Sequence, residues 1–88
     1  MSHVNPETAG LDELARSLVK GKRYPGLWVE HVAKTFNPKA PKNQTWMAVL
    51  HSEQPPGQVL NFTGHGASPC GAVILALCFE RVSRQGWG

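Results

Sequence analysis

The residue pair that comes nearest to a catalytic arrangement in this sequence is His65 and Cys70. Cys70 directly follows Ser68-Pro69, a pair typical of a helix start, and reactive thiols often occupy the first turn of a helix. His65 precedes it by about one turn, where it could act as a base. However, no third residue is recognisable that would orient the histidine, and no oxyanion site is apparent. The sequence therefore predicts a packed or idle cysteine and a protein that is not an enzyme.

The sequence contains no recognisable motif for a metal site or a phosphate-binding loop. No Cys-x-x-Cys or His-x-x-x-His spacing occurs, and Gly64-x-Gly66 lacks the lysine and third glycine of a phosphate-binding loop. We therefore expect no metal and no cofactor, and we expect these glycines to make a sharp strand-to-helix turn. On one helix, Cys70 and Cys78 would lie about 12 Å apart, too far for a disulfide, which predicts reduced thiols. The possible metal donors are His3, His31, His51, His65, Cys70 and Cys78.

Positive charge offers a candidate for binding. Nine Lys and Arg against six Asp and Glu give a net charge of +3, which permits an acidic partner without requiring one. If the basic residues converge, they form an anion-binding or nucleic-acid patch, with Tyr24 or Trp28 available to stack on a base. The alternative is an ordinary solvated surface. The candidate partner-binding residues are Lys20, Lys22 and Arg23 after the first predicted helix and Lys34, Lys39 and Lys42 around a long loop.

Tryptophan supplies the other candidate contact. Trp46 alternates with strand periodicity and is expected in the core. Trp87 follows the last predicted helix between two glycines, where it either docks on a partner or folds back onto its own domain.

Two helices are predicted to frame these residues. Ser68 is expected to cap the second helix, with Pro69 in its first turn. Its eight-residue apolar run, 72–79, is far shorter than the roughly 20 residues that span a bilayer. The expected apolar face of the first helix, which ends before Gly21, comprises Leu11, Leu14, Ala15, Leu18 and Val19. The expected apolar face of the second helix comprises Ala72, Leu75, Ala76, Phe79 and Val82.

Strands are predicted between the helices. Residues 45–51 and 59–63 alternate apolar and polar side chains around the turn signal Gln54-Pro55-Pro56-Gly57, which indicates an antiparallel hairpin. Residues 27–36 match a helical stripe but are rich in β-branched and aromatic residues, so we favour a strand and keep a helix as the alternative. The segment 37–43 is expected to be an exposed loop because its prolines cannot join a β-ladder.

These elements give an α+β fold of order αβββα, a three-stranded antiparallel sheet with two helices packed on one face. The 88 residues, 41% of them hydrophobic and 17% charged, predict one globular domain over 1–88, with a loose segment 1–8 and a tail 85–88. No secretory signal is recognisable, so we expect a cytoplasmic protein.

This order resembles the double-stranded-RNA-binding domain over roughly residues 10–83. The resemblance rests on Leu11-Asp12-Glu13-Leu14 in the first helix, a loop with Pro and Lys after the first strand, and Gly64-His65-Gly66-Ala67-Ser68 before an Ala-rich last helix. The order is also similar to small phage-encoded α/β sandwich proteins and to some anti-CRISPR inhibitors that have this fold without its RNA function. The resemblance implies the fold and leaves the activity open.

The three RNA contacts of that family are only partly present here. Its groove-reaching glutamate is matched by Glu13, but the segment Asn37-Pro38-Lys39-Ala40 lacks the histidine of its loop. Its three lysines at the start of the last helix are replaced by Pro69, Cys70 and Val73. Because phosphate contacts supply most of the affinity for nucleic acid, these replacements predict loss of duplex binding.

The sequence therefore favours a small non-enzymatic binding protein of the type that phages encode to block host defence complexes such as CRISPR effectors. Its partner would be a host protein or ribonucleoprotein, contacted by the open face of the sheet and by Lys39 and Lys42. Trp87 and the outer stripe of the last helix would form a second patch or a homodimer seam. The alternative is a nucleic-acid-binding module for duplex RNA.

Overall fold

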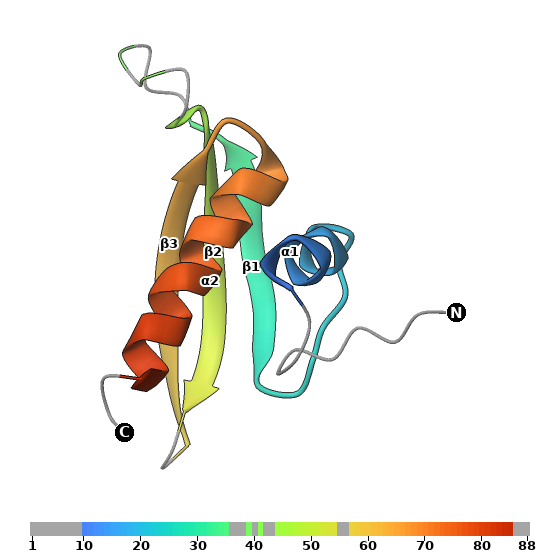
Figure 1. Cartoon of the computed structure of the whole chain (residues 1–88), viewed down its shortest axis with the longest axis vertical. Coiled ribbons are helices and arrows are strands. Elements are labelled where there is room, and N and C mark those ends of the chain that lie inside the picture. Colours follow the sequence, from blue (N-terminus) through green and yellow to red (C-terminus); the bar gives the residue numbers. More distant parts are fainter. Residues whose placement is uncertain (1–9, 36–38, 40, 42–43, 55–56, 86–88) are drawn as a thin grey trace.

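The computed structural model describes residues 10–35, 39, 41, 44–54 and 57–85. Three strands form one antiparallel sheet in the order β1-β2-β3, and both helices lie on the same face of it (Figure 1). This arrangement confirms the α+β prediction. The predicted loose segment 1–8 lies outside the described residues, and so does the predicted tail 85–88 apart from Gln85, which is the last residue of α2. The elements in chain order are α1 (Leu11–Val19), β1 (Leu27–Lys34), β2 (Trp46–Gln54), β3 (Gln58–Gly66) and α2 (Pro69–Gln85).

Helix α1 has the predicted bounds and the predicted apolar face. Leu14, Ala15 and Leu18 are buried, while acidic side chains in the first turn suit the positive end of the helix dipole. The helix ends before Gly21, whose φ of 98° lies in a region that favours glycine. The amphipathic spacing therefore predicted both the element and the side that packs.

Residues 27–34 form a strand, as favoured over the helical alternative. β1 pairs with β2 from Leu27 opposite Ser52 to Lys34 opposite Trp46, so ladder hydrogen bonds and cross-strand packing override the helical spacing of its apolar residues. The register shifts between Val29 and His31, as at a β-bulge.

The predicted hairpin is present: β2 starts one residue later than predicted and continues to Gln54, and β3 extends beyond its predicted bounds at both ends. The Gly57 N–H donates to the Gln54 carbonyl at 2.8 Å, which closes the turn, and Gly57 has a φ of 113°. β2 and β3 pair without interruption from Trp46 opposite Gly66 to Gln54 opposite Gln58.

Helix α2 starts as predicted. The Gly71 N–H donates to Ser68 Oγ at 3.0 Å, and Pro69 is the first helical residue. No helix among the described residues is both long and apolar enough to cross a bilayer. The hydroxyl of buried Ser52 donates to the carboxylate of buried Glu80 at 3.1 Å, which links α2 to β2.

The buried face of α2 differs from the predicted one. Leu75, Phe79 and Val82 were expected in the core, yet they are 37%, 48% and 66% exposed. Apolar residues cover more than half of this helix, so its periodicity does not determine which side meets the sheet. The side chains that do meet the core are Ala72, Val73, Ala76, Leu77 and Glu80.

Gly64 and Gly66 set this rotation, and their role differs from the predicted turn. Both lie within β3, and neither has a positive φ. A Cβ on Gly64 would overlap the carbonyl oxygen of Ala72, and a Cβ on Gly66 would lie 2.6 Å from the Ala72 backbone nitrogen. The glycines therefore allow the backbone of α2 to approach β3 directly.

Candidate partner-binding surface

The face of the sheet opposite the helices is uncovered in the described part of the chain, and we call it the open face. Side chains alternate across a strand, so the register places each residue on one face. Three cross-strand rows define the centre of the open face: Trp28–His51–Asn61, His31–Val49–Thr63 and Ala33–Met47–His65. Glu53 opposite Val59 forms a further row at the hairpin end.

The open face is apolar at its centre and polar around it. Ala33, Met47 and Val49 are half-buried, although no helix covers them. The uncovered face of an antiparallel sheet is usually polar. Here the polar side chains lie on the flanking strands instead, at His31, Asn61, Thr63 and His65. An apolar centre within a polar rim is the pattern of protein–protein interfaces.

One corner of the open face carries a stacked aromatic cluster. The rings of Trp28 and His51 are stacked with centroids 5.5 Å apart and planes inclined by 9°. The Arg23 guanidinium lies 5.2 Å from the centre of the Trp28 ring. Tyr24 and Leu27 exchange two backbone hydrogen bonds, 2.9 and 3.0 Å long, which fix the chain that carries Arg23. The indole is thus held in place before any partner arrives, which lowers the entropy cost of binding.

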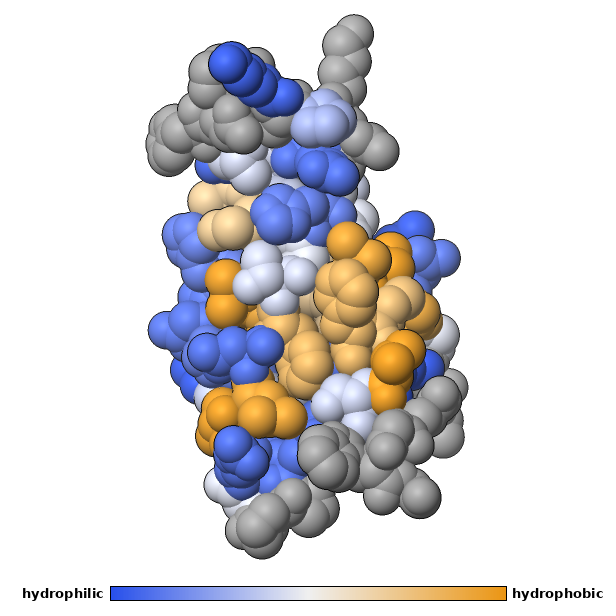
Figure 2. Space-filling model, turned by 90° about the vertical axis from the view of Figure 1, so that its left-hand side faces the viewer, coloured by the Kyte–Doolittle hydropathy of each residue, from blue (hydrophilic) through white to orange (hydrophobic). Residues whose placement is uncertain are grey.

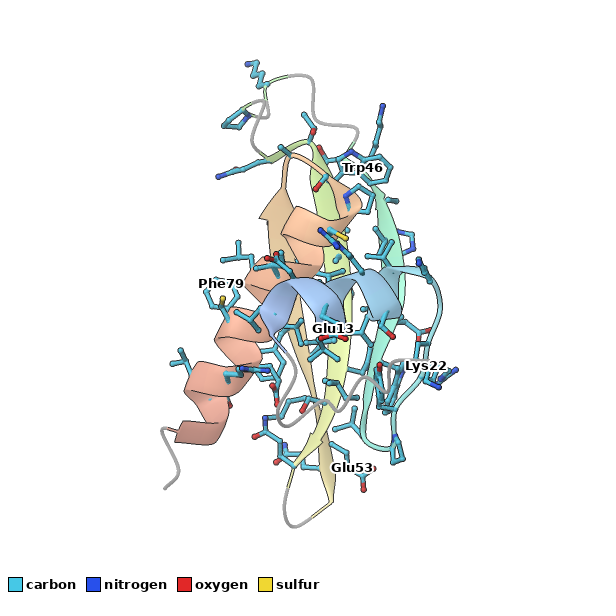
Figure 3. The ribbon with its side chains drawn as sticks, turned by 45° about the vertical axis from the view of Figure 1, so that its right-hand side comes forward. Glu13, Lys22, Trp46, Glu53 and Phe79 are labelled. Atoms are coloured by element: carbon cyan, nitrogen blue, oxygen red, sulfur yellow. The ribbon has the colours of Figure 1, made fainter. Side chains whose placement is uncertain are left out.

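The predicted basic residues form two separate groups in the structure. Lys20, Lys22 and Arg23 precede β1, whereas Lys34 ends it, so the strand separates them by about 23 Å at about 3.3 Å per residue. Figure 3 shows Lys22 and Trp46, the pairing partner of Lys34, at different heights of the sheet. The structure does not merge the two groups into one patch.

Among the remaining candidates, Lys39 is exposed in the connection after β1. Lys42 and Trp87 lie outside the described residues. Trp46 is half-buried and packs against the core, in agreement with its predicted place.

The two rings that were expected to stack on a base, Tyr24 and Trp28, already contact other side chains of the protein. Tyr24 is buried, and its hydroxyl shares a 2.7 Å hydrogen bond with Ser17 Oγ, while the Lys22 ammonium lies 5.8 Å from its ring centre. Trp28 already stacks with His51 and Arg23. This arrangement weakens the case for a base-stacking platform.

Of the positions that contact RNA in the resembling family, the glutamate of the first helix is present here, but the phosphate-binding positions at the start of α2 lack positive charge. Glu13 is exposed on α1 (Figure 3). At the start of α2, Val73 is fully buried in the core, and Pro69 and Cys70 are half-buried. A buried valine cannot replace a phosphate-binding lysine, so the structure supplies no phosphate clamp at these residues.

The possible catalytic pair is not assembled. His65 belongs to the open face, whereas Cys70 lies in α2 on the opposite face of the sheet. Cys70 and Cys78 are free thiols. Within the described ranges, no three His, Cys, Asp or Glu side chains gather as a metal site.

Comparison with known proteins adds no relative: no protein-family model matches the chain, and no curated protein or solved structure shows significant similarity to it. The surface itself must therefore carry the functional argument. Sequence reasoning named the open face but did not identify Met47, Val49 and His51 as the residues that its central strand contributes. Strand alternation contained that signal, because it separated these three residues from Trp46, Ala48 and Leu50.

Proposed function

We propose that this chain is a non-enzymatic binding protein whose open face docks on a protein surface and acts by covering it. The observation that carries the proposal is the half-buried apolar centre of Ala33, Met47 and Val49, surrounded by polar side chains. The described open-face rows contain no Lys or Arg. Phosphate backbones require such cations, so the open face suits a protein better than a nucleic acid.

The area of the open face indicates which neighbouring residues take part. Three strands about 4.8 Å apart and about 30 Å long present about 430 Å² in projection. A standard interface buries about 800 Å² on each partner. Residues at the margins must therefore contribute, and we assign this role to Arg23 before β1 and to Lys39 after it. We assign the same role to Lys42, because it follows Lys39 by three residues in the sequence. Lys34 points to the helix side, where its ammonium lies 5.7 Å from the centre of the Trp46 ring, so it is not part of this surface.

We further propose that the target is a host defence complex of the CRISPR-effector kind, blocked in the host cytoplasm by a phage-encoded protein. The net charge of +3 favours association with an acidic surface, or with the part of a ribonucleoprotein that carries nucleic acid. The small size of the chain and its resemblance to compact inhibitors support the proposal, and the element order agrees with that resemblance.

Capture from host lysate, with and without nuclease, tests the protein-partner proposal. We expect the immobilised chain to retain the same protein in both arms, because the open face binds protein directly. Loss of the captured material after nuclease treatment, together with a shift of labelled duplex RNA at low salt, would instead support the nucleic-acid module. A Lys39→Glu variant should slow association without abolishing capture, since this exposed residue lies at the margin.

A further inference from the structure

The two edges of the sheet are protected very differently. β1 has a register shift at Val29–His31 and carries exposed charged side chains at Glu30 and Lys34, all of which discourage pairing with another strand. β3 has nine residues, none of them Asp, Glu, Lys, Arg or Pro, and its pairing with β2 is unbroken. Its outer edge is therefore a regular template for another strand.

An apolar strip of α2 lies beside this edge. Ala72 and Ala76 sit against Gly64 of β3, and the exposed residues Leu75, Phe79 and Val82 adjoin them on the helix surface. Phe79 points away from α1 in Figure 3. Figure 2, which faces the β3 edge, shows hydrophobic surface over both elements. The edge band comprises Val59, Leu60, Phe62, Leu75, Phe79 and Val82.

We propose that the edge band is the interface of a homodimer, in which β3 pairs antiparallel with β3 of a second copy. Pairing about a two-fold axis places each residue near the axis opposite itself or a close neighbour. A charged strand would then oppose like charges, which is destabilising. β3 carries no Asp, Glu, Lys or Arg, so no two such like charges would face each other in any register of the β3–β3 pair.

The helices fit the same arrangement. α2 lies over β2 and β3 (Figure 1). Continuing the sheet at a strand spacing of about 4.8 Å brings the two copies of α2 to an axial separation on the order of 10 Å. Packed helices are separated by about 8–10 Å, and the exposed strip of α2 supplies the apolar side chains to fill that space. Strand pairing and helix packing are thus satisfied together by a second copy.

The available area is compatible with such a dimer. β3 is about 30 Å long, and one strand width plus one helix width is about 15 Å, so the edge band measures about 450 Å² in projection. That is of the order that a small specific interface takes from each partner. The resulting six-stranded sheet would present two open faces side by side, which doubles the surface described above. The dimer does not depend on the proposed function, because it uses the outer edge of β3 and the surface of α2, and shares only Val59 with the open face.

Sedimentation equilibrium over a hundredfold range of concentration tests the homodimer. We expect wild type to reach twice the mass of the chain, and Phe79→Glu and Phe79→Lys each to remain at one chain. Phe79 lies near the middle of α2, so antiparallel helices bring it opposite its own copy. An equimolar mixture of the two variants should therefore regain the dimer, because Glu and Lys then face each other.

Arg16→Glu is the matched control, since Arg16 is exposed on α1. This variant should dimerise like wild type. All variants should keep the wild-type circular dichroism spectrum, and their melting temperatures should agree within a few degrees when measured at a concentration low enough that wild type is dissociated. Wild type that stays at one chain at the highest concentration overturns the proposal. So does a Phe79→Glu variant that dimerises as strongly as wild type, or a mixture that remains monomeric.

Discussion

Replacing Gly64 by alanine is expected to lower the free energy of unfolding by about 3 kcal/mol, the upper end of the usual cost of overpacking. The added Cβ would overlap the carbonyl oxygen of Ala72, and that backbone group cannot rotate away as a side chain can. A domain of this size has a total stability on the order of 5–10 kcal/mol. The substitution should therefore remove a large part of it, as measured by urea denaturation.

Gly71→Ala is the matched control for this prediction. A Cβ on Gly71 would meet Ser68 Oγ at 3.3 Å, and this exposed side chain can shift by a few tenths of an ångström. The gain in helix propensity, about 1 kcal/mol, offsets the contact, so we expect a net change within about 1 kcal/mol. An equally small effect of Gly64→Ala would contradict direct packing of α2 on β3.

The order of the elements was predictable because local signals agree along the chain. Leu14, Ala15 and Leu18 give α1 a narrow apolar stripe, and Ser68-Pro69 marks the start of α2. The side of α2 that faces the core was not predictable, because this helix is apolar around more than half of its circumference and several of its sides could pack on the sheet. Gly64 and Gly66 determine it through a backbone contact between distant segments, and a sequence records that contact only as the presence of glycines.

The candidate surface was predictable in part. Alternation in β2 divides Met47, Val49 and His51 from Trp46, Ala48 and Leu50, but the packing of the helices decides which set is left uncovered. The relative positions of the basic residues, in contrast, were not predictable from their spacing in the sequence. Arg23 and Lys34 are eleven positions apart in the sequence, and only the extended conformation of β1 shows that they flank opposite ends of a strand.

Val49→Glu is expected to weaken binding of the captured partner at least a hundredfold, which corresponds to about 3 kcal/mol. Val49 occupies the middle row of the open face on its central strand, so a partner that covers this face would bury the new carboxylate without a counter-ion. Titration of the purified partner by calorimetry measures the change.

Two controls accompany this variant. Val49→Thr keeps the β-branched shape and adds a hydroxyl that can bond to water, so it should weaken binding much less than glutamate. Arg16→Glu changes the charge on the exposed side of α1 and should leave the affinity within a few-fold of wild type. If Arg16→Glu weakened binding as strongly as Val49→Glu, net charge rather than the open face would control recognition.

Site-specific photo-crosslinking tests most directly whether the open face is the binding surface. The photoreactive residue benzoylphenylalanine would replace Val49 on the open face in one sample and Arg16 on α1 in another. Each sample would be irradiated in nuclease-treated host lysate and analysed by mass spectrometry. We predict a covalent adduct with one host protein from position 49 and none from position 16. Adducts from position 16 alone would contradict the account, because they would place the partner on the helices.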